Sequence, residues 1–137
     1  MGSVIGRLLL CAVFVASAGC GQSELELGER IFLQGRGADT RLDYRQGPPW
    51  LARAGQGCAV CHGREGQGRV VQAGKLTGAA PALTGDALRA RGYDQSSLRR
   101  AIVDGLDPSG REFSYYMPRW ILSDREMMAL QRFLATL

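Results

Sequence analysis

Residues 58–62 read Cys58-Ala59-Val60-Cys61-His62, and this pentapeptide is the most informative motif in the chain. Two thiols three residues apart can reach the two vinyl groups on one edge of a porphyrin and form a thioether with each. The histidine that follows then lies beneath the iron, where a ring nitrogen can be the proximal ligand. The pattern predicts one covalently attached haem c, bound through Cys58 and Cys61, with His62 as an axial iron ligand.

Two other uses of a Cys-X-X-Cys pair fit this sequence less well. A redox-active pair is expected in a βαβ context, which the sequence lacks. Half of a zinc site would need a second pair of Cys or His ligands. His62 is the sole histidine, and the remaining cysteines, Cys11 and Cys20, belong to an N-terminal segment of different character. A His-rich metal site and a four-cysteine zinc site are therefore excluded.

Length and composition indicate one ordinary globular domain. The chain has 137 residues, of which 45% are hydrophobic and 22% are charged, and its net charge is +4. These values do not fit a disordered chain or one embedded in a membrane.

Residues 1–19 are predicted to be a bacterial secretory signal rather than a part of the fold. Arg7 precedes the apolar run Leu8–Val15, and small residues follow as far as Gly19. The apolar stretch is shorter than the ~20 residues that a membrane-spanning helix needs. We therefore expect the mature chain outside the cytoplasm, in a compartment that permits disulfides.

The sequence Ser17-Ala18-Gly19-Cys20 resembles a bacterial lipobox, in which the cysteine is acylated. Ser17 departs from the leucine usual at its position. We expect a lipid anchor on Cys20 and a short linker over residues 20–22. Residue 21 is a glycine and not the acidic residue that signals retention in the inner membrane. The anchor is therefore expected in the outer membrane rather than the inner one. The alternative is ordinary cleavage after Ala18, which would leave a soluble periplasmic protein.

Taken with the haem motif, residues 23–137 resemble a class I monohaem cytochrome c. The resemblance implies an all-α fold whose N- and C-terminal helices cross beside a single covalently bound haem. Capping boxes at 23–26 and 123–126 predict the starts of these two helices, and residues 94–105 predict another between them. Apolar residues follow each capping box at helical spacing: Leu27, Ile31 and Phe32 in the first helix, and Met127, Leu130, Phe133, Leu134 and Leu137 in the last.

The resemblance also implies contacts around the haem. Crossing helices of the family bring a small residue against an aromatic one, here Gly28 and Phe133. The segment Ala80–Gly85 resembles the family's Pro-x-Leu segment, so the Pro81 carbonyl is expected to accept a hydrogen bond from His62. Leu83 is expected to pack on the haem face. The further residues expected in the haem environment are Trp50 and Tyr116.

Trp50 lies in the segment 35–57, which is longer than in compact family members. This segment contains Gly47-Pro48-Pro49-Trp50, a pattern typical of a turn and extended chain. The indole either covers a haem edge or propionate, or simply packs in the core. The glycine-rich segment 63–74 follows no predicted strand, so dinucleotide binding is not expected there.

The sixth iron ligand is predicted to be Met117. The chain offers no second histidine, and Met117 stands before Pro118, which blocks regular helix at that point. The family's distal loop carries the same Met-Pro pair. Met127 and Met128 lie on the predicted last helix, where a core role explains Met127. Lys75 is a remote competitor.

His/Met ligation predicts a one-electron carrier rather than an enzyme, because no coordination position is open to substrate. Positive side chains outnumber negative ones between Arg36 and Lys75, which suits redox partners with acidic docking patches and does not suggest nucleic acid. Arg64 and Arg69 are possible partners of the haem propionates. Two alternatives stay open: a sensor or peroxidase with a labile Met117, and a subunit through which electrons enter a larger oxidoreductase.

Overall fold

The computed structural model describes residues 19–73 and 76–137. The predicted secretory signal therefore lies outside the described residues apart from Gly19, and so does Lys75. The described helices are α1 (Gly19–Gln34), α2 (Pro49–Ala54), α3 (Ala59–His62), α4 (Gly85–Ala90), α5 (Gln95–Val103) and α6 (Asp124–Leu134). The described strands are β1 (Asp43–Gln46), β2 (Arg69–Ala73), β3 (Leu76–Ala80) and β4 (Arg119–Ile121).

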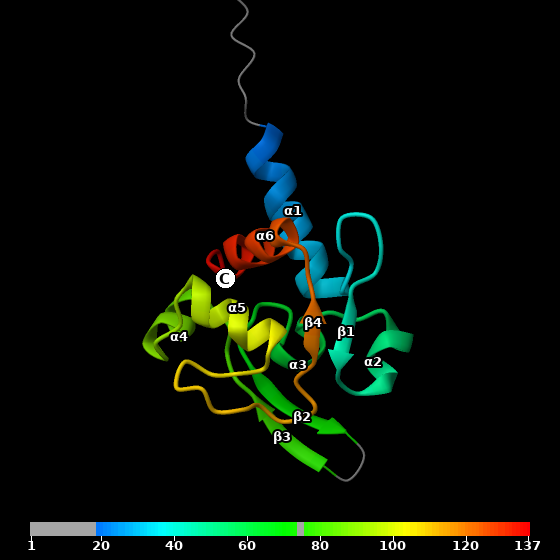
Figure 1. Cartoon of the computed structure of the whole chain (residues 1–137), viewed down its shortest axis with the longest axis vertical. Helices are drawn as coiled ribbons and strands as arrows, with labels where there is room; N and C mark the ends of the chain where they lie inside the picture. Colours follow the sequence, from blue (N-terminus) through cyan, green and yellow to red (C-terminus); the bar gives the residue numbers. More distant parts are fainter. Residues whose placement is uncertain (1–18, 74–75) are drawn as a thin grey trace, which may run out of the picture.

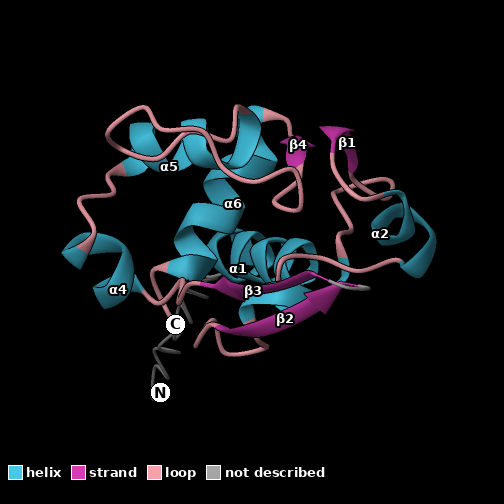
Figure 2. Cartoon of the chain, turned by 90° about the horizontal axis from the view of Figure 1, so that it is seen from below, coloured by secondary structure: helices cyan, strands magenta, loops and turns pink. Residues whose placement is uncertain are grey.

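The fold is mostly helical, but the prediction of an all-α fold is wrong in part. Strand β1 pairs antiparallel with β4, with Tyr44 opposite Trp120, and β2 pairs antiparallel with β3. Figure 2 shows the hairpin β2–β3 on one side of the molecule and α5 on the opposite side, with α4 and α2 between them at the two ends. No described helix has both the length and the apolar content needed to cross a membrane.

Helices α1 and α6 cross as predicted (Figure 1). Gly28 makes the crossing close: a Cβ atom placed there would lie 2.7 Å from Phe133 Cβ and would also overlap the backbone carbonyl of Ala129. The expected contact of a small residue with an aromatic one is confirmed. Beside it, the rings of Phe32 and Phe133 pack with their centroids 5.5 Å apart.

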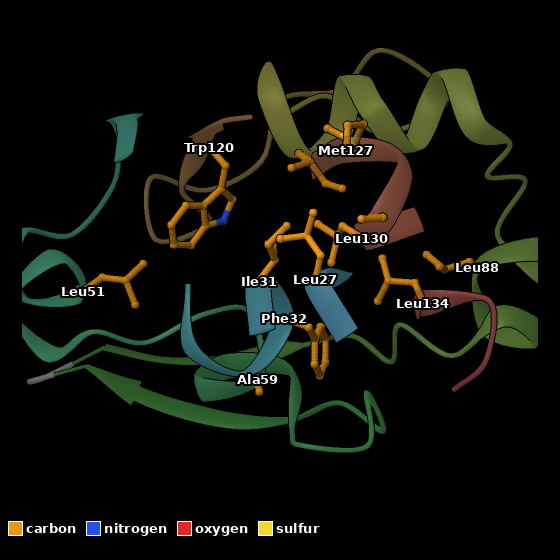
Figure 3. Packing of buried hydrophobic residues seen from close by; sticks show 12 residues of the cluster. Leu27, Ile31, Phe32, Leu51, Ala59, Leu88, Trp120, Met127, Leu130 and Leu134 are labelled. Atoms are coloured by element: carbon orange, nitrogen blue, oxygen red, sulfur yellow. The ribbon is translucent and has the colours of Figure 1, made fainter. Parts of the chain in front are cut away.

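The hydrophobic core extends from this crossing toward α3 and β4. Leu27, Ile31 and Phe32 are fully buried, as their helical spacing predicted. The same cluster contains Met127 and Leu130 of α6 (Figure 3). The other labelled members are Leu51, Ala59, Leu88, Trp120 and Leu134.

Of the two predicted capping boxes, the one at Ser123 is confirmed and the one at Ser23 is wrong. Ser123 accepts a hydrogen bond from the Glu126 backbone in a full capping box, and Asp94 caps α5 in the same manner. By contrast, α1 begins at Gly19, so Ser23 lies inside the helix rather than at its N-cap. Residues 20–22, which we expected to form a linker, are helical. About one kcal/mol of capping energy does not fix a helix start where the preceding residues can also be helical.

One loop prediction is corrected by regular structure. Residues 49–54 form α2, with Pro49 at its first position, where the missing N–H of proline costs nothing. Trp50 therefore stands on a helix and not in extended chain. The described part of the glycine-rich segment, residues 63–73, ends in β2, whose pairing with β3 places Val71 opposite Gly78.

The Gly28 contact yields a prediction. Gly28→Ala should lower the free energy of unfolding of the haem-loaded protein by about 1–3 kcal/mol, because the added methyl group meets backbone atoms of α6 that cannot move independently. Glu26→Ala, at an exposed position of the same helix, should change it by no more than about 0.5 kcal/mol. Denaturant unfolding measures both. A Gly28→Ala variant as stable as the wild type would show that the crossing is looser than described.

Candidate functional site

The Cys58–His62 pentapeptide forms a single helical turn. Cys58 precedes α3, and its carbonyl accepts hydrogen bonds from the backbone N–H groups of Cys61 (3.2 Å) and His62 (3.0 Å). Positions i, i+3 and i+4 share one face of a helix. The turn therefore presents both thiols and the imidazole toward the same space, which is the arrangement that attachment to one flat ring requires.

The two cysteines are free thiols that are not bonded to each other. Burial raises the pKa of Cys58 to about 12. Burial also raises the pKa of Cys61, and the positive charge of Arg69 opposes this shift. Redox-active and zinc-binding cysteines have a lowered pKa that favours the thiolate. The raised pKa of each thiol indicates that its surroundings do not favour the thiolate.

His62 is buried and its ring orientation is fixed. Its Nδ1 lies 2.8 Å from the backbone oxygen of Pro81, the contact that the family resemblance implied. A carbonyl oxygen can only accept, so Nδ1 carries the proton and Nε2 keeps a free lone pair. Burial lowers the pKa of His62, while the Pro81 carbonyl acts in the opposite direction. The ring is therefore held as the neutral imidazole that binds metals.

These groups line one cavity of about 420 Å³. All the haem-environment residues predicted from the sequence lie in its wall: Trp50, Cys58, Cys61, His62, Pro81, Leu83, Tyr116 and Met117. Most of the remaining wall is apolar, contributed by α5 through Leu98, Ala101 and Ile102 and by β4 through Trp120. An apolar cavity with two thiols, a neutral imidazole and a thioether fits an iron porphyrin.

The sequence analysis missed part of this wall. The hairpin β2–β3 contributes Val71, Thr77 and Gly78. The available signal was the β-branched pair Val70-Val71 before Gly74 and Thr77 after it, and the many glycines nearby obscured this signal. Arg91 and Tyr93, at the end of α4, also line the cavity, whereas Arg64 and Arg69 are not among its lining residues. Arg91 is held there by hydrogen bonds to the carbonyls of Ala87 and Ala82.

Met117 reaches the cavity from the loop that joins α5 to β4. The Phe113 N–H donates to the Gly105 carbonyl (2.8 Å), and the Met117 N–H donates to the Ser114 carbonyl (3.0 Å). The Tyr115 hydroxyl donates to the Gly47 carbonyl (2.6 Å), which ties this loop to the segment before α2.

Earlier in the loop, hydrogen bonds from Ser109 and Arg111 lower the pKa of Asp107 to about 2.

The described methionines differ sharply in their surroundings. Met117 lines the cavity, Met127 is buried in the core of α6, and Met128 is 52% exposed. Among the described residues, Met117 is thus the single methionine in the wall that contains His62. No group of three or more His, Cys, Asp or Glu side chains suited to a metal ion occurs in the described ranges.

A family model described as Cytochrome c matches residues 52–137, more than half of the chain. The chain belongs to the cytochrome c family. Comparison with curated proteins and with solved structures gave no match. As a cytochrome c, the protein carries covalently bound haem c with its iron, and it is a haem electron-transfer protein. The matched region contains every residue of the cavity wall named above except Trp50.

The attachment geometry of this cytochrome c yields a second prediction. The double replacement Cys58→Ser with Cys61→Ser should give protein whose haem is extracted completely by acidified organic solvent, because no thioether remains. Each single replacement should retain covalent haem through the other cysteine. Haem staining of a denaturing gel measures the difference.

Cys20→Ser is the matched control, because Cys20 lies far from the pentapeptide in the sequence and should leave the haem stain unchanged. Covalent haem in the double variant would show that another residue forms the bond.

Proposed function

We propose that this cytochrome c is an exported one-electron carrier of the class I type, whose iron is bound by His62 on one side and Met117 on the other. The observation that carries the proposal is the shared cavity: Met117 lines the space that Cys58, Cys61 and His62 enter from α3. The other described methionines are poor alternatives, since Met127 is buried in the hydrophobic core and Met128 is exposed. Lys75 lies outside the described residues.

The side chains around the cavity suit this role. The Pro81 carbonyl orients His62 so that Nε2 is left for the iron. A hydrogen bond of this kind, made by the ring nitrogen that does not bind the metal, also raises the basicity of the ligating nitrogen. Apolar residues of α5 line the cavity, and they would limit the access of water to a haem bound there. The haem supplies reversible exchange of one electron at its iron, and His/Met ligation favours the reduced state.

A carrier with both axial positions filled by side chains offers no position to oxygen, peroxide or an organic substrate. This separates the proposal from the sensor or peroxidase alternative, which needs Met117 to leave. The subunit alternative is compatible with the same site and differs only in whether the partner stays bound.

The proposal includes a lipid anchor on Cys20 and partners with acidic docking patches. Cys20 lies near the start of α1, and Figure 1 shows the first turns of this helix projecting beyond α6. Glu24, which pairs with Arg125 at 2.8 Å, marks where the helix meets the rest of the domain. Exposed arginines follow in the sequence on both sides of the haem motif: Arg36, Arg41, Arg45, Arg53, Arg64 and Arg69. Such charge speeds association with an acidic partner.

A third prediction tests the ligand set. Ferrous wild-type protein should show no spectral change on addition of carbon monoxide, whereas Met117→Ala should bind it stoichiometrically because the sixth position is open. Met127→Leu is the matched control, since a near-isosteric core change should cost less than about 1.5 kcal/mol and leave the spectrum unchanged. Optical titration measures all three. Ready binding by the wild type would contradict Met117 ligation and favour the sensor or peroxidase.

A fourth prediction tests the anchor. Intact mass analysis of protein produced with its signal should show a chain that begins at Cys20 and carries lipid, and Cys20→Ser should move the haem from the membrane to the soluble fraction. An unmodified chain that begins at Gly19 would remove the anchor and leave the electron-transfer role as it stands.

A further inference from the structure

Arg119 is a buried cation on β4. Its side chain is 5% exposed, and it is not among the residues that line the cavity. Burial of an arginine is costly unless its donors are paired, so its partners indicate why it is there.

The Arg119 guanidinium donates to three backbone carbonyls of one turn. Nη2 donates to the Phe113 carbonyl (2.8 Å), and Nη1 donates to those of Ser114 (3.3 Å) and Met117. The Glu112 carboxylate lies 3.6 Å from Nη2 and is itself largely exposed. The buried cation therefore pairs mainly with the turn that ends at Met117, and to a lesser degree with a carboxylate.

The rest of the fold keeps this guanidinium in position. Residue 119 pairs with Gln46 in the β1–β4 ladder, and the neighbouring Trp120 is buried against Tyr44 with ring centroids 5.7 Å apart. On the other side, Gly105 leaves room: a Cβ atom there would overlap Nε and Cζ of Arg119. The arginine thus links a strand fixed by pairing to a turn that has no regular structure of its own.

We propose that Arg119 is the positioning residue for Met117: its planar set of donors binds the carbonyls on both sides of the turn and holds the sulfur in the cavity. The inference rests on the proposed function, in which Met117 binds the iron. A guanidinium suits this task because its five N–H donors lie in one rigid plane, whereas a lysine ammonium is a compact charge on a flexible stem. Without it, carbonyls of the turn lose charge-assisted hydrogen bonds, and the turn can open.

The experiment uses haem-loaded Arg119→Leu and Arg119→Lys beside the wild type. Two readouts report on Met117: the weak long-wavelength absorption band of ferric haem with a sulfur ligand, and carbon monoxide binding by the ferrous form. Arg119→Leu should lose most of the band and raise the fraction that binds carbon monoxide by about tenfold or more, the effect expected from losing one charge-assisted hydrogen bond. Arg119→Lys should lie between Arg119→Leu and the wild type.

Two controls separate positioning from general effects. Arg111→Leu removes the same charge from the same loop, but its described partner is Asp107, outside the turn, so both readouts should stay as in the wild type. Leu27→Ala destabilises the core without touching the cavity, so at equal loss of stability it should keep the band. Loss of the band in Leu27→Ala to the same degree would reduce Arg119 to a general stabiliser.

The remaining outcomes also test the inference about Arg119. An Arg119→Leu protein with the wild-type band and no carbon monoxide binding would overturn the inference. If neither Arg119 variant folds around haem, the inference is also overturned, because Arg119 would then stabilise the whole domain rather than position Met117. If the wild type lacks the band, or if Met117→Ala keeps it, the proposed ligand set fails first, which is distinguishable from a failure of Arg119 alone.

Discussion

The hydrogen bond between His62 and Pro81 is the contact on which the arrangement of the domain depends. The helical turn at α3 brings two thiols and an imidazole to one face, but a turn of four residues cannot by itself set the angle of the ring. The chain must return to supply a carbonyl, and the hairpin β2–β3 makes this return, since β3 ends at Ala80, directly before Pro81. Backbone hydrogen bonds from Gly68 to the His62 carbonyl (2.8 Å) and from Leu83 to the Gly66 carbonyl (2.6 Å) join the two segments. The hairpin therefore serves twice: it orients the histidine and closes one wall of the cavity.

Sequence reasoning succeeded where the determining interactions are local or follow from the family. The capping box at Ser123 is complete within four residues, so the start of α6 could be predicted. The polar residues at 94–97 predicted the start of α5, where the structure shows Asp94 as the N-cap. The site residues could be named because attachment chemistry fixes the spacing of Cys58, Cys61 and His62. The His62–Pro81 contact was available only through the family resemblance, because nothing in the intervening sequence indicates how the chain returns.

The errors share a different cause. Strand β1 pairs with β4 across some seventy residues of sequence. The four residues of β1, Asp43–Gln46, have no local pattern that predicts such a partner. Arg119 was not singled out, because an arginine beside Met-Pro reads as an exposed charge until the carbonyls of residues 113–117 are seen to converge on it. The start of α1 was misplaced because the capping preference of Ser23 is small beside the hydrogen bonds that an additional helical turn forms.

The two sides of the site are held in unlike ways, and this difference bears on function. His62 lies next to the attachment cysteines, on a turn packed against α1, with its second nitrogen bonded to backbone. Met117 lies in a turn without helix or strand, and what holds it there is one buried guanidinium together with the Tyr115 hydroxyl bond to Gly47. In the proposed carrier, the same two ligands must stay in place in both oxidation states, so the distal turn has to be as fixed as the proximal one. A buried arginine is costly to a small domain, and a structural need of this kind gives a reason for keeping it.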